Sequence, residues 1–407
     1  MKFFSATARA GLMLLIPVLG TAATAAEKQY GPGVTDTEIK IGNIMAYSGP
    51  ASGYGTIGKA EAAYFATIND RGGINGRKIN FISRDDGYSP PKTVEVARQL
   101  VEQEQVLLLF SNLGTPTNLA IRGYMNERKV PQLSIISGAD TFNDPEHFPW
   151  TAPALASYHL EGSIYGRYIS KNLPDAKIAV LYQNDDFGKD KLLGLRQGLG
   201  DKADKLIVAT QSYETTDPTV DSQILSLRAS GANVLFVAAL AKIHAQAIRK
   251  VYDIGWKPTY FVDLGGQSLK AVLQPAGVEK AVGLISATWN KSVTDPQWRD
   301  DPEYKEWLAW MKEYNPSGDI SDDLNAGGYQ LGHFMAHVLE ACGNDLTREN
   351  VMKQAASLQG YRLPLFLPGV VMSNSPHDYE AIKQMQLTKF DGSAWKLFGE
   401  LISGVSN

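Results

Sequence analysis

The sequence predicts an α/β fold with two lobes, each built on a doubly wound parallel sheet. Strand and helix signals alternate along residues 37–284, and repeated strand–helix units favour parallel sheets covered by helices on both faces. The alternation falls into two blocks, near 37–153 and 154–284, which indicates two lobes. No low-complexity linker separates them, so we expect several short segments to join the lobes.

The first block begins with the most regular pattern in the chain. The expected elements are strands at 39–46, 78–83, 106–110 and 133–136, and helices at 58–70, from 89 and at 118–128. Gly72 and Gly73 end the first helix, as left-handed caps prefer. Residues 106–110 form a continuous apolar run, which is typical of a strand buried on both faces.

The second block repeats the alternation. The expected elements are strands at 178–182, 205–209, 234–239 and 260–262, and helices at 155–172, 190–200, 220–230 and 241–253. The remainder differs from both blocks. Helices are expected at 298–314 and 331–341, and strands at 366–373 and 385–399, which close on a turn at Phe390-Asp391-Gly392-Ser393.

The N-terminus has the features of a secretory signal peptide over residues 1–26. Lys2 and Arg9 precede a short apolar stretch, and Ala23 and Ala25 provide a small-residue cleavage site. We therefore expect a periplasmic protein that is cut after Ala25 or Ala26. The net charge of −4 gives no electrostatic argument for binding nucleic acid.

A glycine-rich loop follows the first strand. Gly53, Gly55 and Gly58 match a dinucleotide-binding pattern, and Lys59 nearly completes a phosphate-binding loop. Ala60 stands where such a loop needs a hydroxyl for Mg²⁺, and an exported protein meets little nucleotide. We expect no nucleotide cofactor. The free amides of a helix N-terminus still suit a small anion, including a carboxylate.

Two polar loops follow neighbouring strands of the first block. Residues 111–118 come after the strand at 106–110, and residues 137–139 come after the next strand. Open α/β sheets bind ligands at the carboxyl ends of their strands. The loops are consistent with a carboxylate site, and equally with ordinary helix capping. Tyr47, Tyr54, Phe187 and Trp289 lie where strands meet loops and could wall an apolar slot.

The sequence offers no catalytic set. It contains neither an H-E-x-x-H nor a G-x-S-x-G motif, so we expect no enzyme. His333 and His337 lie four residues apart, but a metal would need further ligands, and we expect no metal or other cofactor.

Several motifs resemble the leucine/isoleucine/valine-binding proteins of ABC importers. They are Ser48-Gly-Pro, Tyr54-Gly55, Ile68-Asn69, Gly72-Gly-Ile-Asn-Gly, Asp85-Asp86, Asp186-Phe-Gly188 and Leu346-Thr-Arg-Glu-Asn350. The resemblance covers nearly all of the mature chain. It implies two lobes with a three-crossing hinge, closure on a small ligand without catalysis, a monomer, and a membrane permease as partner. It also implies lobe I at 27–154 plus 286–362 and lobe II at 155–285 plus 363–407.

The resemblance also implies a ligand site. Tyr54 would pack on the ligand, while Phe187, Leu240 and Ala241 would cover it from the second lobe. The ligand carboxylate would be held by first-lobe residues Asn112, Leu113, Gly114, Thr115, Ser137, Gly138 and Ala139.

The sequence departs from that family at two places. Tyr88 and Leu113 stand where members often carry a disulfide. Leu264, beside Asp263, stands where an acid usually meets the ligand ammonium. Burying an ammonium without a counter-charge costs several kcal/mol. Unless Asp263 turns inward, we expect a small organic carboxylate without an amine, aromatic in the preferred case.

Two alternatives stay open. One is a branched-chain or other amino-acid-binding protein that uses Asp263. The other is an extracytoplasmic sensor module.

Overall fold

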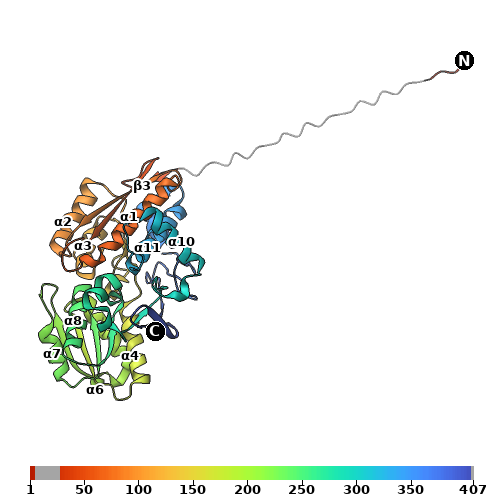
Figure 1. Cartoon of the computed structure of the whole chain (residues 1–407). Coiled ribbons are helices and arrows are strands. Elements are labelled where there is room, and N and C mark those ends of the chain that lie inside the picture. The colour runs from red at the N-terminus through yellow and green to blue at the C-terminus, as the bar shows by residue number, and fades with distance from the viewer. Residues whose placement is uncertain (5–27, 405–407) are drawn as a thin grey trace.

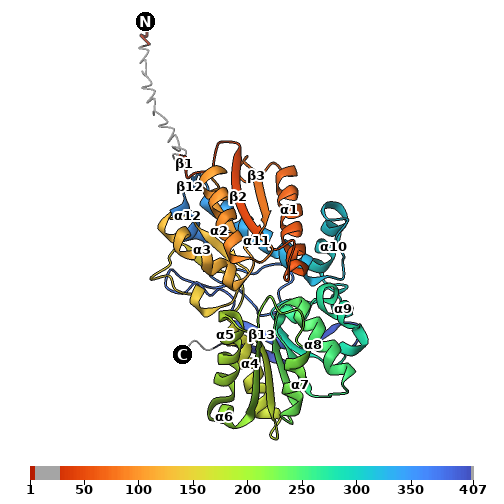
Figure 2. The same ribbon diagram turned by 90° about the vertical axis from the view of Figure 1, so that its left-hand side faces the viewer.

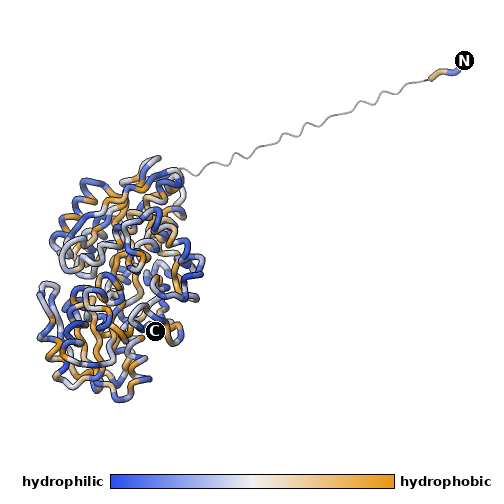
Figure 3. The backbone as a smooth tube through the Cα atoms, in the orientation of Figure 1, coloured by the Kyte–Doolittle hydropathy of each residue, from blue (hydrophilic) through white to orange (hydrophobic). Residues whose placement is uncertain are grey.

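The chain forms two α/β lobes, one above the other in Figure 1. The structure is a computed structural model that describes residues 1–4 and 28–404. The predicted signal peptide and its cleavage site fall almost entirely outside the described residues. Hydrophobic segments gather inside each lobe, and hydrophilic ones lie mostly on the outside (Figure 3).

The first lobe contains a five-stranded parallel sheet in the order β3-β2-β4-β5-β6. Its strands are β2 (Glu38–Met45), β3 (Lys78–Asp85), β4 (Leu108–Phe110), β5 (Gln132–Ile135) and β6 (Thr151–Pro153). Its helices are α1 (Gly55–Asp70), α2 (Pro90–Arg98) and α3 (Thr115–Glu127). Every residue of β4 is buried, as its apolar run predicts.

The second lobe contains a seven-stranded sheet in the order β14-β13-β11-β10-β9-β7-β8. Its strands are β7 (Ile178–Gln183), β8 (Ile207–Tyr213), β9 (Val234–Ala238), β10 (Thr259–Val262), β11 (Ile285–Thr288), β13 (Gln384–Phe390) and β14 (Trp395–Ser403). Its helices are α4 (Tyr158–Asn172), α5 (Asp186–Leu199), α6 (Ala203–Leu206), α7 (Asp221–Ala229), α8 (Ala241–Asp253) and α9 (Gln274–Ala276). The strands from β8 to β11 are parallel, and β13 and β14 add an antiparallel edge.

Both faces of the second sheet are covered, as the doubly wound prediction requires. Ile178 and Val180 of β7 join one hydrophobic cluster, whereas Ala179 and Leu181 join another on the opposite face. Successive side chains of a strand point to opposite faces, so this alternation places apolar layers on both sides.

Three further helices complete the first lobe: α10 (Pro302–Tyr314), α11 (Asp323–Cys342) and α12 (Arg348–Ala355). Figures 1 and 2 place α11 beside α1 in the upper lobe. Gly328 of α11 lies against α1, because a Cβ added there would come within 2.5 Å of the Ile57 carbonyl oxygen. A short parallel pair joins β1 (Gln29–Tyr30) to β12 (Asp345–Leu346).

The chain passes between the lobes three times. It leaves the first lobe after β6, returns after β11, and crosses again between α12 and β13. These passages agree with the predicted three-crossing hinge. The domain boundaries given above stay a prediction.

One predicted strand is wrong. Residues 366–373 form no strand and contribute only isolated bridges, such as Asn290 with Phe366 and Tyr361 with Met372. Pro368 has no amide hydrogen to donate, and Gly369 turns the chain with a φ of 86°. The expected strand at 385–399 is two strands, β13 and β14, around the predicted turn.

Several helices begin earlier than expected because their caps lie upstream. The Asp185 carboxylate accepts a hydrogen bond from the Gly188 amide and starts α5. Asp322 does the same for α11 by accepting from the Leu324 amide. In contrast, α10 starts later, at Pro302, after Asp301 as its cap.

Candidate functional site

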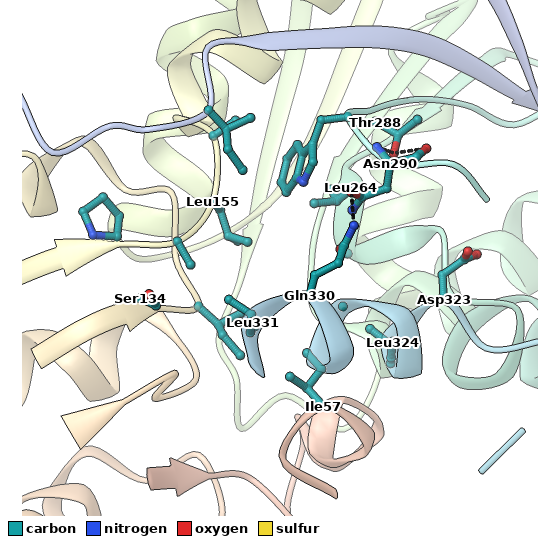
Figure 4. A pocket seen from close by; sticks show the side chains of 18 of the residues that line it. Ile57, Ser134, Leu155, Leu264, Thr288, Asn290, Asp323, Leu324, Gln330 and Leu331 are labelled. Carbon is teal, nitrogen blue, oxygen red and sulfur yellow. Dashed lines mark hydrogen bonds between the residues drawn. The ribbon is translucent and has the colours of Figure 1, made fainter. Parts of the chain in front are cut away.

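A cavity lies between the lobes and beside the three crossings. Its volume is about 240 Å³, far above the roughly 15 Å³ that one water needs on this measure. Its walls come from both lobes and are mostly apolar. Figure 4 shows Leu155, Leu264 and Leu331 around it, with Gln330 of α11 reaching the Asn290 side chain, 2.9 Å away. The cavity can therefore enclose a small, largely apolar molecule.

The first-lobe wall includes the start of α3. Leu113, Gly114 and Thr115 line the cavity. Gly114 has a φ of 101°, and a Cβ there would come within 2.4 Å of the Tyr88 ring. Glycine is therefore required both by the backbone and by the packing of Tyr88. The amides of Thr115 and Thr117 lie in the first turn, where amides have no partner within the helix.

Hydroxyl groups reinforce this wall. The Thr115 Oγ1 and Ser137 Oγ atoms lie 2.8 Å apart and share one hydrogen bond. Ser137 Oγ also accepts the Ala139 amide at 3.1 Å. The loops after β4 and β5 thus meet side by side, as expected for the carboxyl ends of neighbouring parallel strands.

Tyr54 joins the two lobes across the cavity. Its hydroxyl donates a hydrogen bond to the Gly265 carbonyl oxygen of the second lobe, at 3.2 Å. Burial of the ring and hydroxyl raises the pKa of Tyr54, so the group stays a neutral donor. The structure therefore presents the lobes in contact, closed over the cavity.

The second-lobe wall is formed by Phe187, Leu240, Asp263 and Leu264. Asp263 does turn inward, and its carboxylate is buried. One carboxylate oxygen lies 2.5 Å from His244 Nε2 and the other 3.3 Å from Lys191 Nζ. The counter-charge that an amine ligand would need is therefore already paired within the protein.

Five predicted site residues lie elsewhere. Gly138 and Ala139 line a separate hollow beside Asp140 and Glu380. Asn112, Ser137 and Ala241 line neither space. The Asn112 side-chain oxygen accepts the Ile44 amide at 2.8 Å, so this residue holds its loop to β2. These positions support the wall from behind.

Sequence reasoning missed two charged residues on the second-lobe wall. Lys191 of α5 and Glu161 of α4 are buried and joined by an ion pair. Glu161 also accepts the Leu264 amide at 2.7 Å and so helps to place the end of β10. The missed signal is a glycine spacing of four in each helix: Gly162, Gly166, Gly194 and Gly198.

Those glycines bring the two helices into backbone contact. A Cβ at Gly162 would come within 2.4 Å of the Lys191 carbonyl oxygen, and a Cβ at Gly194 within 2.4 Å of the His159 carbonyl oxygen. Any side chain there would push α4 and α5 apart. The close approach is what lets Glu161 reach Lys191.

The glycine-rich loop at 53–58 has a packing explanation. A Cβ at Gly58 would come within 2.4 Å of the Tyr47 hydroxyl, and one at Gly53 within 2.9 Å of Ala271 in the second lobe. The glycines let α1 approach both groups closely, which accounts for them without a phosphate.

The described residues hold no group of three or more His, Cys, Asp or Glu that could bind a metal ion. His333 instead packs between Tyr64 and Tyr329, and burial lowers its pKa to about 4. No helix in the described part of the chain is long and apolar enough to cross a membrane.

Comparison with known proteins identifies relatives along most of the chain. The family model described as periplasmic binding protein matches residues 38–394. A Leu/Ile/Val-binding protein homolog 1 of Brucella suis is 25% identical over 323 residues, which is 77% of this chain and 81% of that protein.

Solved structures share the fold. A branched-chain amino acid ABC transporter protein from Thermus thermophilus with bound valine has a TM-score of 0.79 at 17% identity, covering 91% of this chain and 98% of that one. A fatty acid ABC transporter substrate-binding protein from Thermomonospora curvata has a TM-score of 0.77 at 21% identity, with 93% and 95% covered. A solute-binding protein from R. palustris in complex with 4-hydroxybenzoate has a TM-score of 0.75 at 16% identity, with 90% and 97% covered.

Proposed function

The chain belongs to the periplasmic binding protein family, and from this premise we propose that it captures a small organic carboxylate and passes it to the membrane permease of an ABC importer. The ligand has an apolar body, aromatic in the preferred case. The protein holds it by closing two lobes and does no chemistry to it.

The observation that carries this proposal is the cavity enclosed by both lobes. Ligand contacts contributed by two lobes exist together only when the lobes are closed, so binding energy favours closure. The Tyr54 hydroxyl donates to Gly265 across the cavity and adds a contact specific to that closed form. A permease can then distinguish loaded from empty protein by shape.

The lining supports an acid with an apolar body. The first-turn amides of α3 and the Thr115 hydroxyl are donors suited to a carboxylate. Leu155, Trp289 and Leu331 offer apolar surface for the rest of the molecule. Asp263, the acid available to an amine, is already paired with Lys191 and His244.

The second candidate is an amino-acid ligand. The Leu/Ile/Val-binding homologues and the inward position of Asp263 favour it. On this alternative, the ammonium of the ligand would have to share a carboxylate that two cationic partners already contact.

The test is a thermal-shift screen of carboxylates against amino acids, followed by calorimetric titration with benzoate, 4-hydroxybenzoate and leucine. A ligand that binds only the folded protein raises its melting temperature. We expect aromatic acids to bind with micromolar affinity, which corresponds to about −8 kcal/mol. Strong leucine binding with no response to aromatic acids would replace the preferred ligand class by the alternative.

A further inference from the structure

The second-lobe wall of the cavity contains a ready-made site for an ammonium group, and the protein fills it with its own side chain. Lys191 Nζ forms an ion pair with Glu161 and lies 3.3 Å from an Asp263 carboxylate oxygen. The exposed fractions of the three side chains are 1%, 4% and 3%, so water screens these contacts little. All three residues line the cavity.

Aromatic rings complete the enclosure. Lys191 Nζ lies 4.3 Å from the centre of the Tyr158 ring and 5.7 Å from that of Phe187. A cation within about 6 Å of an aromatic face is attracted by the ring quadrupole. Two carboxylates and two rings around one nitrogen are the surroundings by which proteins recognise an amine.

The charges on this wall depend on one another. Burial opposes charge on Asp263, but Lys191 and His244 outweigh it and hold the pKa of that carboxyl below its usual value. Burial and the neighbouring Asp263 raise the pKa of Glu161. Burial alone would lower the pKa of Lys191, and the two carboxyls reverse this and raise it. The lysine therefore stays an ammonium ion, and it keeps Asp263 ionised.

We propose that Lys191 is a specificity-determining residue that occupies a built amine site and thereby excludes ligands with an ammonium group at this wall. An incoming ammonium would meet the like charge of Lys191 and find both carboxylates taken. Without the lysine, the same wall would bind a primary alkylammonium ion. The meaning for ligand choice rests on the proposed solute-binding role, whereas the amine site itself does not.

The experiment replaces the lysine side chain by a free amine. Lys191→Ala removes three carbons and the nitrogen, which are the atoms of n-propylammonium. We expect n-propylammonium to raise the melting temperature of Lys191→Ala saturably, with half of the effect at about 1 mM, the scale for a ligand of four non-hydrogen atoms. The wild-type protein should show no such shift.

The controls separate the site from general effects of amines. 1-Propanol has the same chain without the charge and should not rescue Lys191→Ala. Lys191→Met keeps the side-chain volume without the charge, so it should be destabilised and not rescued. Lys250→Ala removes a partly exposed lysine 2.9 Å from Asp221 and should not respond to the amine.

Equal stabilisation of Lys191→Ala by 1-propanol, or none by n-propylammonium, would overturn the proposal. If Lys191→Ala does not fold, the readout is the yield of folded protein after refolding with each compound, judged by the same criteria. Because no carboxylate is used, a positive amine result combined with a failed acid screen would reject the proposed ligand and keep the amine site.

Discussion

Tyr54→Phe tests whether closure of the lobes contributes to binding. The change removes the hydroxyl that donates to the Gly265 carbonyl oxygen at 3.2 Å and keeps the ring that lines the cavity. A neutral hydrogen bond contributes about 0.5–1.5 kcal/mol net, and this one is long, so we take about 0.5–1 kcal/mol. Because only the closed form makes the bond, the loss should weaken ligand binding about two- to fivefold.

The assay is calorimetric titration of wild-type and variant protein with 4-hydroxybenzoate, or with leucine if the screen favours amino acids. Tyr260→Phe is the matched control, since the Tyr260 hydroxyl is buried in the second lobe without a hydrogen-bond partner among the described residues. Its loss should leave affinity unchanged and stability equal or slightly higher. Equal affinities of Tyr54→Phe and wild type would refute a role for this bond in closure.

Three further predictions follow from the structure. Gly328→Ala should lower the free energy of unfolding by about 1–3 kcal/mol, because the new methyl would meet the Ile57 carbonyl oxygen. Gly327→Ala meets nothing within 4 Å and should raise it by up to about 1 kcal/mol; equal effects in urea denaturation would contradict the packing of α11 on α1. Burial raises the pKa of Asp323, on the cavity wall, to about 7, so this group is neutral below pH 7 and negative above it. Affinity for a carboxylate should then fall above pH 7 by at most about tenfold per pH unit, and Asp323→Asn should flatten the profile; a flat wild-type profile would count against this. Mass spectrometry of the exported protein should find a mature chain that begins after Ala25 or Ala26, and an uncut chain would contradict the signal-peptide prediction.

The fold was predictable because its strands and helices carry strong local patterns. The apolar run at 106–110 and the glycine stop after α1 are readable without any tertiary information. Residues 366–373 look equally apolar, but Leu365 and Phe366 are buried in an irregular segment beside the cavity. Apolar composition indicates burial there, and only the neighbouring elements decide the backbone geometry.

The site was predictable only in part, for the same reason. Leu113 to Thr115 follow directly from a strand end, where ligand loops are expected. Lys191 and Glu161 are thirty residues apart, and each sits on a helix with no local mark of function. Their meeting depends on how closely α4 approaches α5. The direction of Asp263 is likewise set by His244 and Lys191, which come from other elements.

The glycine contact between α4 and α5 separates the frame of the wall from its chemistry. Main-chain atoms set the spacing of these helices, so the side chains at 158, 187 and 191 can be exchanged without altering the scaffold that carries them. A protein built in this way can acquire a new cargo through a few substitutions. It is also a suitable starting point for a designed biosensor, in which the recognised molecule changes and the closing motion stays.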